Sequence, residues 1–135
     1  MDGVLKPALR RLPGAAAFCA ALFAAFAGAA FADGDAVRGA TLFKTNCAVC
    51  HHIEKGAAPL IGPSLFAVSG RTAASLPGFA YSAAMKKSGL VWTDAQLVTY
   101  LKAPMAVVPG TKMAFAGLKG TGQADAVAAY LKTLK

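Results

Sequence analysis

Residues 47–51 read Cys-Ala-Val-Cys-His, a C-x-x-C-H run that constrains this chain more than any other feature. The run is the attachment pattern of a c-type haem. Each thiol can add across one vinyl group of the porphyrin, and a helical turn spaces the two sulfurs so that they reach both vinyls. The imidazole of His51 then lies under the iron and supplies one axial bond. We therefore expect one haem c, linked covalently through Cys47 and Cys50.

Two other uses of a C-x-x-C pair fit the chain less well. A structural zinc site needs four ligands, and a thioredoxin-type dithiol needs a βαβ setting. The only other cysteine is Cys19, in a segment that we expect to be removed, and the only other histidine is His52. No alternating strand pattern precedes Cys47. Haem attachment is therefore the favoured interpretation.

The first 32 residues have the composition of an export signal. Lys6, Arg10 and Arg11 form a basic start, an uncharged stretch follows, and Ala30-Phe31-Ala32 offers a small-x-small cleavage pattern. We expect a cleaved secretory signal peptide at 1–32 and one mature domain at 33–135. An uncleaved membrane anchor is the alternative, although the stretch is mostly alanine, which is weakly apolar.

The chain is basic, with 14 Lys and Arg against 6 Asp and Glu and a net charge of +8. Removing residues 1–32, which hold three of the basic residues and one acidic residue, leaves +6. This balance favours acidic partner surfaces. No nucleic-acid role is expected, because an exported chain without a basic run or interleaved aromatics lacks the usual signs of one.

Apolar periodicity predicts an all-α domain. A helix is expected over 35–46, with Gly39 marking a close crossing against Tyr130 in a last helix over 123–135. Between these, a short helix is expected over 83–88. Thr93 begins a further helix with a capping box and a hydrophobic staple, and Pro104 stops it. Residues 54–77 contain too many Gly and Pro for regular structure, but are apolar enough to form an ordered loop on the haem.

The second axial ligand is expected to be a methionine. His52 adjoins His51 and cannot reach the far face of the same porphyrin. Met85, Met105 and Met113 then compete, and Met113 is favoured because the Pro-Gly-Thr-Lys turn before it could hold its side chain over the iron. The other two methionines are expected to fill gaps in the core. Histidine with methionine closes both axial positions and raises the reduction potential, which suits electron transfer.

Taken together, these motifs make the chain resemble a class I cytochrome c of the mitochondrial and bacterial c2 type, over essentially all of 33–135. Besides the C-x-x-C-H run, the resemblance is carried by Gly62-Pro63-Ser-Leu65, Gly70-Arg71, Pro77-Gly-Phe79-Ala-Tyr81, Gly89-Leu-Val-Trp92, Tyr100-Leu101 and Val108-Pro-Gly-Thr-Lys-Met113-Ala-Phe115. It implies the cytochrome c fold, with four or five helices and long loops wrapped around one haem.

The resemblance also implies roles for residues around the cofactor. The carbonyl of Pro63 would accept a hydrogen bond from the His51 ring and orient it. Three side chains would hold the haem propionates: Arg71, Tyr81 and Trp92. Two hydroxyls would form a network near Met113: those of Tyr100 and Thr111.

The same resemblance implies a monomeric, soluble electron carrier of the bacterial periplasm rather than an enzyme. Its transient partners would be redox complexes at the membrane: a cytochrome bc1-type donor and an oxidase or photosynthetic reaction centre as acceptor. A small peroxidase or a haem-based sensor is the alternative, and either needs an open or displaceable iron position.

This sequence also departs from the family pattern. Met85 stands where relatives have asparagine, and lysines common around the exposed haem edge are missing from four positions: Thr41, Asn46, Met105 and Gly120. Lys112 and Lys119 remain near that edge. We therefore expect a docking surface that relies less on charge and more on apolar contact.

Overall fold

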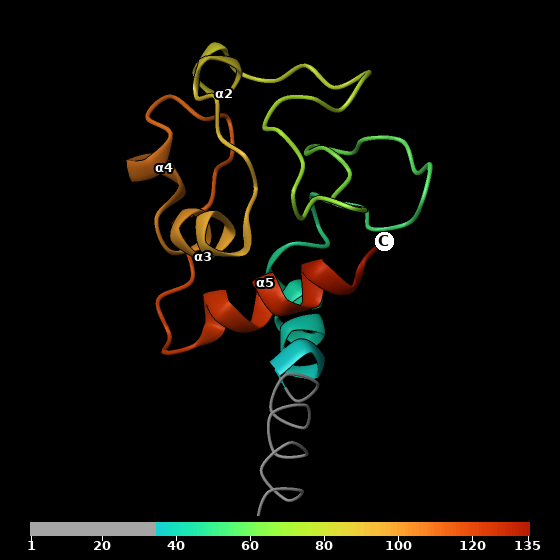
Figure 1. Ribbon diagram of the computed structural model, residues 1–135, viewed down its shortest axis with the longest axis vertical. Coiled ribbons are helices and arrows are strands. Elements are labelled where there is room, and N and C mark those ends of the chain that lie inside the picture. The colour runs from blue at the N-terminus through green and yellow to red at the C-terminus, as the bar shows by residue number, and fades with distance from the viewer. Residues whose placement is uncertain (1–34) are drawn as a thin grey trace, which may run out of the picture.

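Helices joined by long loops make up the computed structural model, which describes residues 35–135 (Figure 1). The chain is helical over residues 35–46 and in α2 (Ala83–Lys87), α3 (Asp94–Lys102), α4 (Pro104–Val107) and α5 (Gln123–Thr133). Among these described residues there is no strand, and the isolated antiparallel bridge pairs Thr72 with Val91. The prediction of an all-α fold with four or five helices is confirmed.

Residues 35–46 cross α5 at close range, as Gly39 predicts (Figure 1). A Cβ added to Gly39 would lie 2.0 Å from the carbonyl oxygen of Ala126 and 2.8 Å from Cβ of Tyr130. One turn further on, the rings of Phe43 and Tyr130 pack with their centroids 5.7 Å apart. The two helices therefore approach backbone to backbone at the crossing, which fixes the position of Cys47 just beyond residue 46.

The start of α3 follows from its capping residue. Thr93 is extended, and its hydroxyl accepts a hydrogen bond from the amide of Gln96 at 3.2 Å. Trp92 and Leu97 flank this cap and are both buried, as a hydrophobic staple requires. The reciprocal half of the predicted capping box is not formed, because the amide of Thr93 donates to the carbonyl of Val91 instead. α3 packs against α5.

Pro104 ends α3 as predicted, but it also begins α4, which the sequence analysis did not predict. Proline suits the first turn of a helix because the missing N–H would be unpaired there in any case. Pro104 is buried, whereas Met105 beside it is 64% exposed. The expectation that Met105 fills a gap in the core is therefore wrong.

The segment between the C-x-x-C-H run and α2 is an ordered loop, as predicted. Its backbone is tied to distant segments. The amide of Ala67 donates to the carbonyl of Leu134 at 2.9 Å, and that of Gly70 donates to the carbonyl of Trp92 at 2.8 Å. Ala67 and Ala74 adopt positive φ angles of 51° and 59°, which are unfavourable for a residue with a Cβ. Tertiary hydrogen bonds therefore hold a strained path around the interior.

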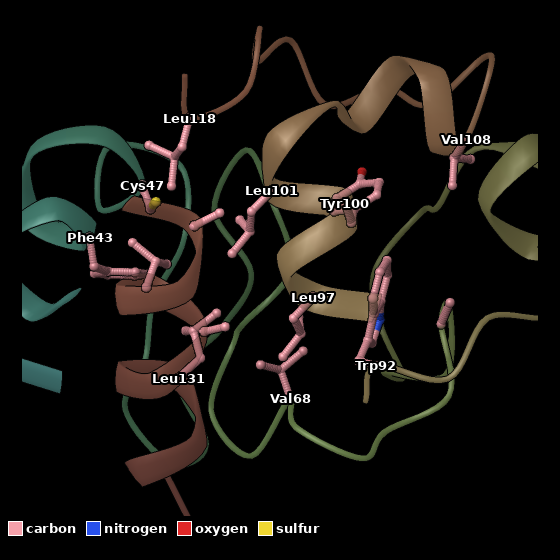
Figure 2. Close-up of a cluster of buried hydrophobic side chains, with 14 of the residues drawn as sticks. Phe43, Cys47, Val68, Trp92, Leu97, Tyr100, Leu101, Val108, Leu118 and Leu131 are labelled. Carbon is pink, nitrogen blue, oxygen red and sulfur yellow. The ribbon is translucent and has the colours of Figure 1, made fainter. Parts of the chain in front are cut away.

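Apolar side chains from every part of the described chain meet in one core. Leu97 and Leu101 project from α3 toward Leu131 of α5, while Trp92 and Tyr100 lie together on the other side (Figure 2). The rings of Trp92 and Tyr100 are 4.9 Å apart. This core forms the inner wall of the site described below.

No helix within residues 35–135 is long and apolar enough to cross a membrane. The predicted signal peptide at 1–32 lies outside the described residues. The division at residue 33 therefore stays a prediction.

Candidate haem site

The apolar core opens into a cavity of about 280 Å³. Helical residues and loop residues from the whole length of the described chain line it. Every site residue predicted from the sequence is among them: Cys47, Cys50, His51, Pro63, Arg71, Tyr81, Trp92, Tyr100, Thr111 and Met113. The structure thus brings to one place residues that are up to 66 positions apart, from Cys47 to Met113.

Cys47 and Cys50 lie on a turn that continues the helix of residues 35–46. The amide of Cys47 donates to the carbonyl of Phe43 at 2.8 Å, and the amides of Cys50 and His51 both donate to the carbonyl of Cys47 at 3.0 Å. Burial, with a smaller contribution from Cys50, raises the pKa of the Cys47 thiol to about 11. Before haem is attached, this thiol is therefore protonated at neutral pH, and within residues 35–135 neither it nor the thiol of Cys50 forms a disulfide.

The imidazole of His51 is oriented by a backbone carbonyl. Its Nδ1 lies 2.7 Å from the carbonyl oxygen of Pro63. Because a carbonyl can only accept, Nδ1 carries the proton and Nε2 keeps its lone pair. Burial lowers the pKa of His51, partly offset by this hydrogen bond, so the ring is neutral at neutral pH. A neutral imidazole with a free Nε2 is the form that binds a metal.

Gly62 leaves the space that the His51 ring occupies. A Cβ on Gly62 would lie 2.4 to 2.9 Å from three atoms of the ring. The amide of Gly62 donates to the carbonyl of Cys50 at 2.9 Å, which holds the glycine against the C-x-x-C-H turn. The sequence analysis did not assign a role to Gly62. Its position directly before Pro63 was the available sign.

A closed set of hydrogen bonds surrounds Met113. The hydroxyl of Tyr100 donates to Met113 Sδ at 3.5 Å and lies 3.2 Å from the hydroxyl of Thr111. The Thr111 hydroxyl also accepts from the amide of Met113 at 3.2 Å. Burial raises the pKa of Tyr100, partly offset by Thr111, so its hydroxyl stays protonated and able to donate. These bonds hold the thioether at the cavity.

Part of the Arg71 guanidinium is hydrogen-bonded to the protein backbone. Its two terminal nitrogens donate to the carbonyls of Phe66 and Ser64 at 3.0 and 2.9 Å. Burial lowers the pKa of Arg71 and raises that of Tyr81, and each group partly offsets the shift of the other. A guanidinium has five N–H donors, so donors remain for an anionic group in the cavity.

The lining also includes residues to which the sequence analysis gave no role at the haem. They are mostly apolar, and three of them lie on helices: Leu97, Leu101 and Leu131. Met85 is buried and lines the cavity from α2. Met105 is not in the lining.

A separate hollow of about 590 Å³ lies beside α3 and α5. Its lining includes Asp94, Asp125 and Lys132 but no thiol, imidazole or thioether.

The donor set of the cavity fits an iron porphyrin. Two thiols one turn apart suit covalent attachment, a neutral imidazole and a thioether suit the iron, and an apolar lining suits the macrocycle. It does not fit a structural zinc site. Within residues 35–135, no group of three or more His, Cys, Asp and Glu side chains could hold a metal ion.

Comparison with known proteins agrees with this geometry. The sequence profile of the family described as "Cytochrome c" matches residues 36–135. The chain belongs to the cytochrome c family. It is 50% identical over 104 residues to a cytochrome c2 of Rhodomicrobium vannielii, a match that spans 77% of this chain and 82% of the relative.

Eukaryotic cytochromes c are similar to the chain as well. Identity to cytochrome c of Gibberella zeae is 46% over 101 residues, covering 75% of this chain and 95% of that one. Identity to cytochrome c of Euglena viridis is 47% over 102 residues, covering 76% and 99%.

Membership in the cytochrome c family defines the cofactor and the general activity. The protein carries haem c, attached covalently through Cys47 and Cys50. It is an electron carrier rather than an enzyme, and it meets its redox partners transiently.

Proposed function

We propose that the protein is an exported, diffusible one-electron carrier of the bacterial periplasm, with His51 and Met113 as the axial ligands. This proposal is based on the cavity, which brings together a neutral imidazole, a thioether and two nearby cysteines. Bound haem supplies an iron that exchanges one electron between its ferric and ferrous states.

The residues around the two ligands limit the structural rearrangement that accompanies this electron exchange. Pro63 and Gly62 leave the His51 ring one orientation, and Tyr100 and Thr111 hold Met113 in place. Ligands fixed by the protein need little rearrangement when the charge at the site changes, because their positions are preorganised. The apolar lining excludes water, which favours the less charged state of the site.

A second group of residues would take up the negative charge of the haem propionates. Arg71 is half-buried at the cavity with N–H donors to spare, and Tyr81 and Trp92 add an O–H and an indole N–H to the same lining. Buried carboxylates need such partners, because an unpaired buried charge is costly.

Export is supported by the basic start, uncharged stretch and small-x-small pattern of residues 1–32. The named bacterial relative, a cytochrome c2, is compatible with this location. The proposed partners are membrane redox complexes, with a cytochrome bc1-type donor and an oxidase or photosynthetic reaction centre as acceptor.

Co-expression with a bacterial haem-attachment system, followed by intact-mass measurement of periplasmic protein, tests the export and the attachment together. We expect a chain that begins at or near Asp33 and keeps its haem after acid-acetone extraction. Protein that retains residues 1–32 would contradict the signal peptide. A peroxidase or sensor would instead show turnover with peroxide, or bind carbon monoxide, at neutral pH.

A further inference from the structure

Asp94, the first residue of α3, joins three segments of the chain through its carboxylate. Its Oδ1 accepts a hydrogen bond from the hydroxyl of Ser69 at 3.1 Å, and its Oδ2 accepts one from the ammonium of Lys132 in α5. Ser69 belongs to residues 64–71, which we call the Arg71 loop. The hydrogen bond from Lys132, followed by that from Ser69, lowers the pKa of Asp94, so its side chain is ionised at neutral pH. One carboxylate therefore links the Arg71 loop to two helices.

A backbone hydrogen bond ties the same loop to the same end of α5. The amide of Ala67 donates to the carbonyl of Leu134 at 2.9 Å, two residues beyond Lys132. The two segments meet near the C-terminus of the chain in Figure 1. Ala67 has a φ angle of 51°, which is unfavourable for a residue with a Cβ, so local preference does not hold the loop in this path. Its anchors on α3 and α5 therefore hold it.

The Arg71 loop in turn holds the guanidinium of Arg71. Two of its nitrogens donate to the carbonyls of Ser64 and Phe66, which precede Ala67 in the same loop. The main chain of Arg71 is fixed as well, because its carbonyl accepts from the amide of Trp92 at 2.9 Å. Arg71 and Trp92 both line the cavity. A shift of the loop would therefore move a cation of the cavity lining.

The surface contact and the cavity are close along the chain. Asp94 is two residues beyond Trp92, and Ser69 is two residues before Arg71. Neither Asp94 nor Ser69 lines the cavity itself. The side chain of Asp94 is 51% exposed, so solvent screens its charge and weakens any direct effect on the iron. An effect of Asp94 on the haem is therefore expected to pass through the position of the loop.

We propose that Asp94 is a positioning residue that raises the reduction potential of the haem from outside the cavity. Its hydrogen bonds to Ser69 and Lys132 hold the Arg71 loop in place, and the loop holds the guanidinium beside the propionates. A fixed cation in a largely apolar site favours the ferrous state, because that state carries one positive charge less. The proposal rests on the proposed role of Arg71 at the propionates.

Spectroelectrochemical titration of the haem-bound protein measures the effect. Asp94→Asn, Lys132→Gln and Ser69→Ala should each lower the ratio of reduced to oxidised protein at a fixed applied potential roughly threefold, which is about 30 mV for one electron. A direct charge effect predicts a different pattern. Removing the carboxylate would then raise the potential, removing the ammonium would lower it, and removing the uncharged hydroxyl would leave it unchanged.

Asp125→Asn is the matched control. Asp125 lines the same hollow as Asp94, is 56% exposed and pairs with Lys102 at 3.8 Å. Within residues 35–135, no hydrogen bond joins its side chain to the Arg71 loop, so its replacement should not lower the potential. Arg71→Lys is the positive reference and should lower the potential at least as much as Asp94→Asn, because lysine lacks the planar fork of donors.

Amide hydrogen exchange of the haem-bound protein gives a readout that does not depend on the iron. The amides of Ala67 and Gly70 donate to the carbonyls of Leu134 and Trp92, which lie outside the Arg71 loop. Both amides should exchange faster in Asp94→Asn than in the wild type, and at the wild-type rate in Asp125→Asn.

Opposite shifts of the potential in Asp94→Asn and Lys132→Gln would overturn the proposal, because they would show a direct charge effect. An equal fall in Asp125→Asn would overturn it as well, and so would unchanged exchange of both amides in Asp94→Asn. An unchanged potential in Arg71→Lys would overturn the proposed role of Arg71 at the propionates, and this proposal with it.

Discussion

Replacing Gly39 by alanine should destabilise the protein, although alanine favours a helix. The added Cβ would lie 2.0 Å from the carbonyl oxygen of Ala126, so residues 35–46 and α5 must separate by at least about 1 Å. Overpacking of this kind destabilises the folded protein by about 3 kcal/mol when the obstacle is backbone. The higher helix propensity of alanine offsets about 1 kcal/mol of that loss. We expect the free energy of unfolding to fall by about 2 kcal/mol, which lowers Tm by roughly 8 °C or more.

Thermal unfolding of the haem-bound protein, followed by circular dichroism, measures this effect. Thr41→Ala is the matched control, because Thr41 is an exposed residue of the same helix, and it should change stability by less than about 0.5 kcal/mol. Adding Tyr130→Ala to Gly39→Ala should not restore stability, since the shortest approach is to backbone and not to the tyrosine. A Tm for Gly39→Ala at or above that of the wild type would refute the close crossing.

Three further perturbations address the ligand, the loop and the surface. Met113→Ala should remove the far-red sulfur-to-iron band of the oxidised protein and lower its potential, as visible spectra and voltammetry would show, whereas Met105→Ala should keep both. Ala74→Gly should relieve the φ angle of 59° and stabilise the protein by about 1 kcal/mol, measured by chemical denaturation; no gain would mean that the loop carries no strain there. The hydrogen bond from Lys132 holds the pKa of Asp94 below its usual value. This hydrogen bond therefore stabilises the folded protein above a pH of about 4, and the stabilisation is lost as the pH falls through the lowered pKa of Asp94. Denaturation of wild type and Asp94→Asn should therefore differ at neutral pH and converge in acid.

Local sequence patterns predicted the parts of the fold that depend on near neighbours. Thr93 caps α3 and Gly39 marks the helix crossing, because both effects arise from the size or hydrogen bonding of one side chain. The same patterns predicted which residues meet at the cavity, through the C-x-x-C-H run and the resemblance that it supported. Their roles as ligands and haem contacts remain predictions.

Other features depend on tertiary contacts that no local pattern encodes. Pro104 is a sign of both a helix end and a helix start, so α4 was missed and Met105 was placed in the core. Alanine gives no sign of a positive φ, and only the hydrogen bond from Ala67 to Leu134 shows why the loop accepts one. The hydrogen bonds from Arg71 to the loop carbonyls could not be predicted from the sequence for the same reason.

Spectroelectrochemical titration of the purified holoprotein at neutral pH, with and without carbon monoxide, tests the central claim most directly. A carrier ligated by His51 and Met113 should show one reversible one-electron step, low-spin spectra in both oxidation states and no change when carbon monoxide is added. Binding of carbon monoxide to the reduced protein, or a high-spin spectrum in either state, would contradict the account, because it would show that the iron keeps an open position.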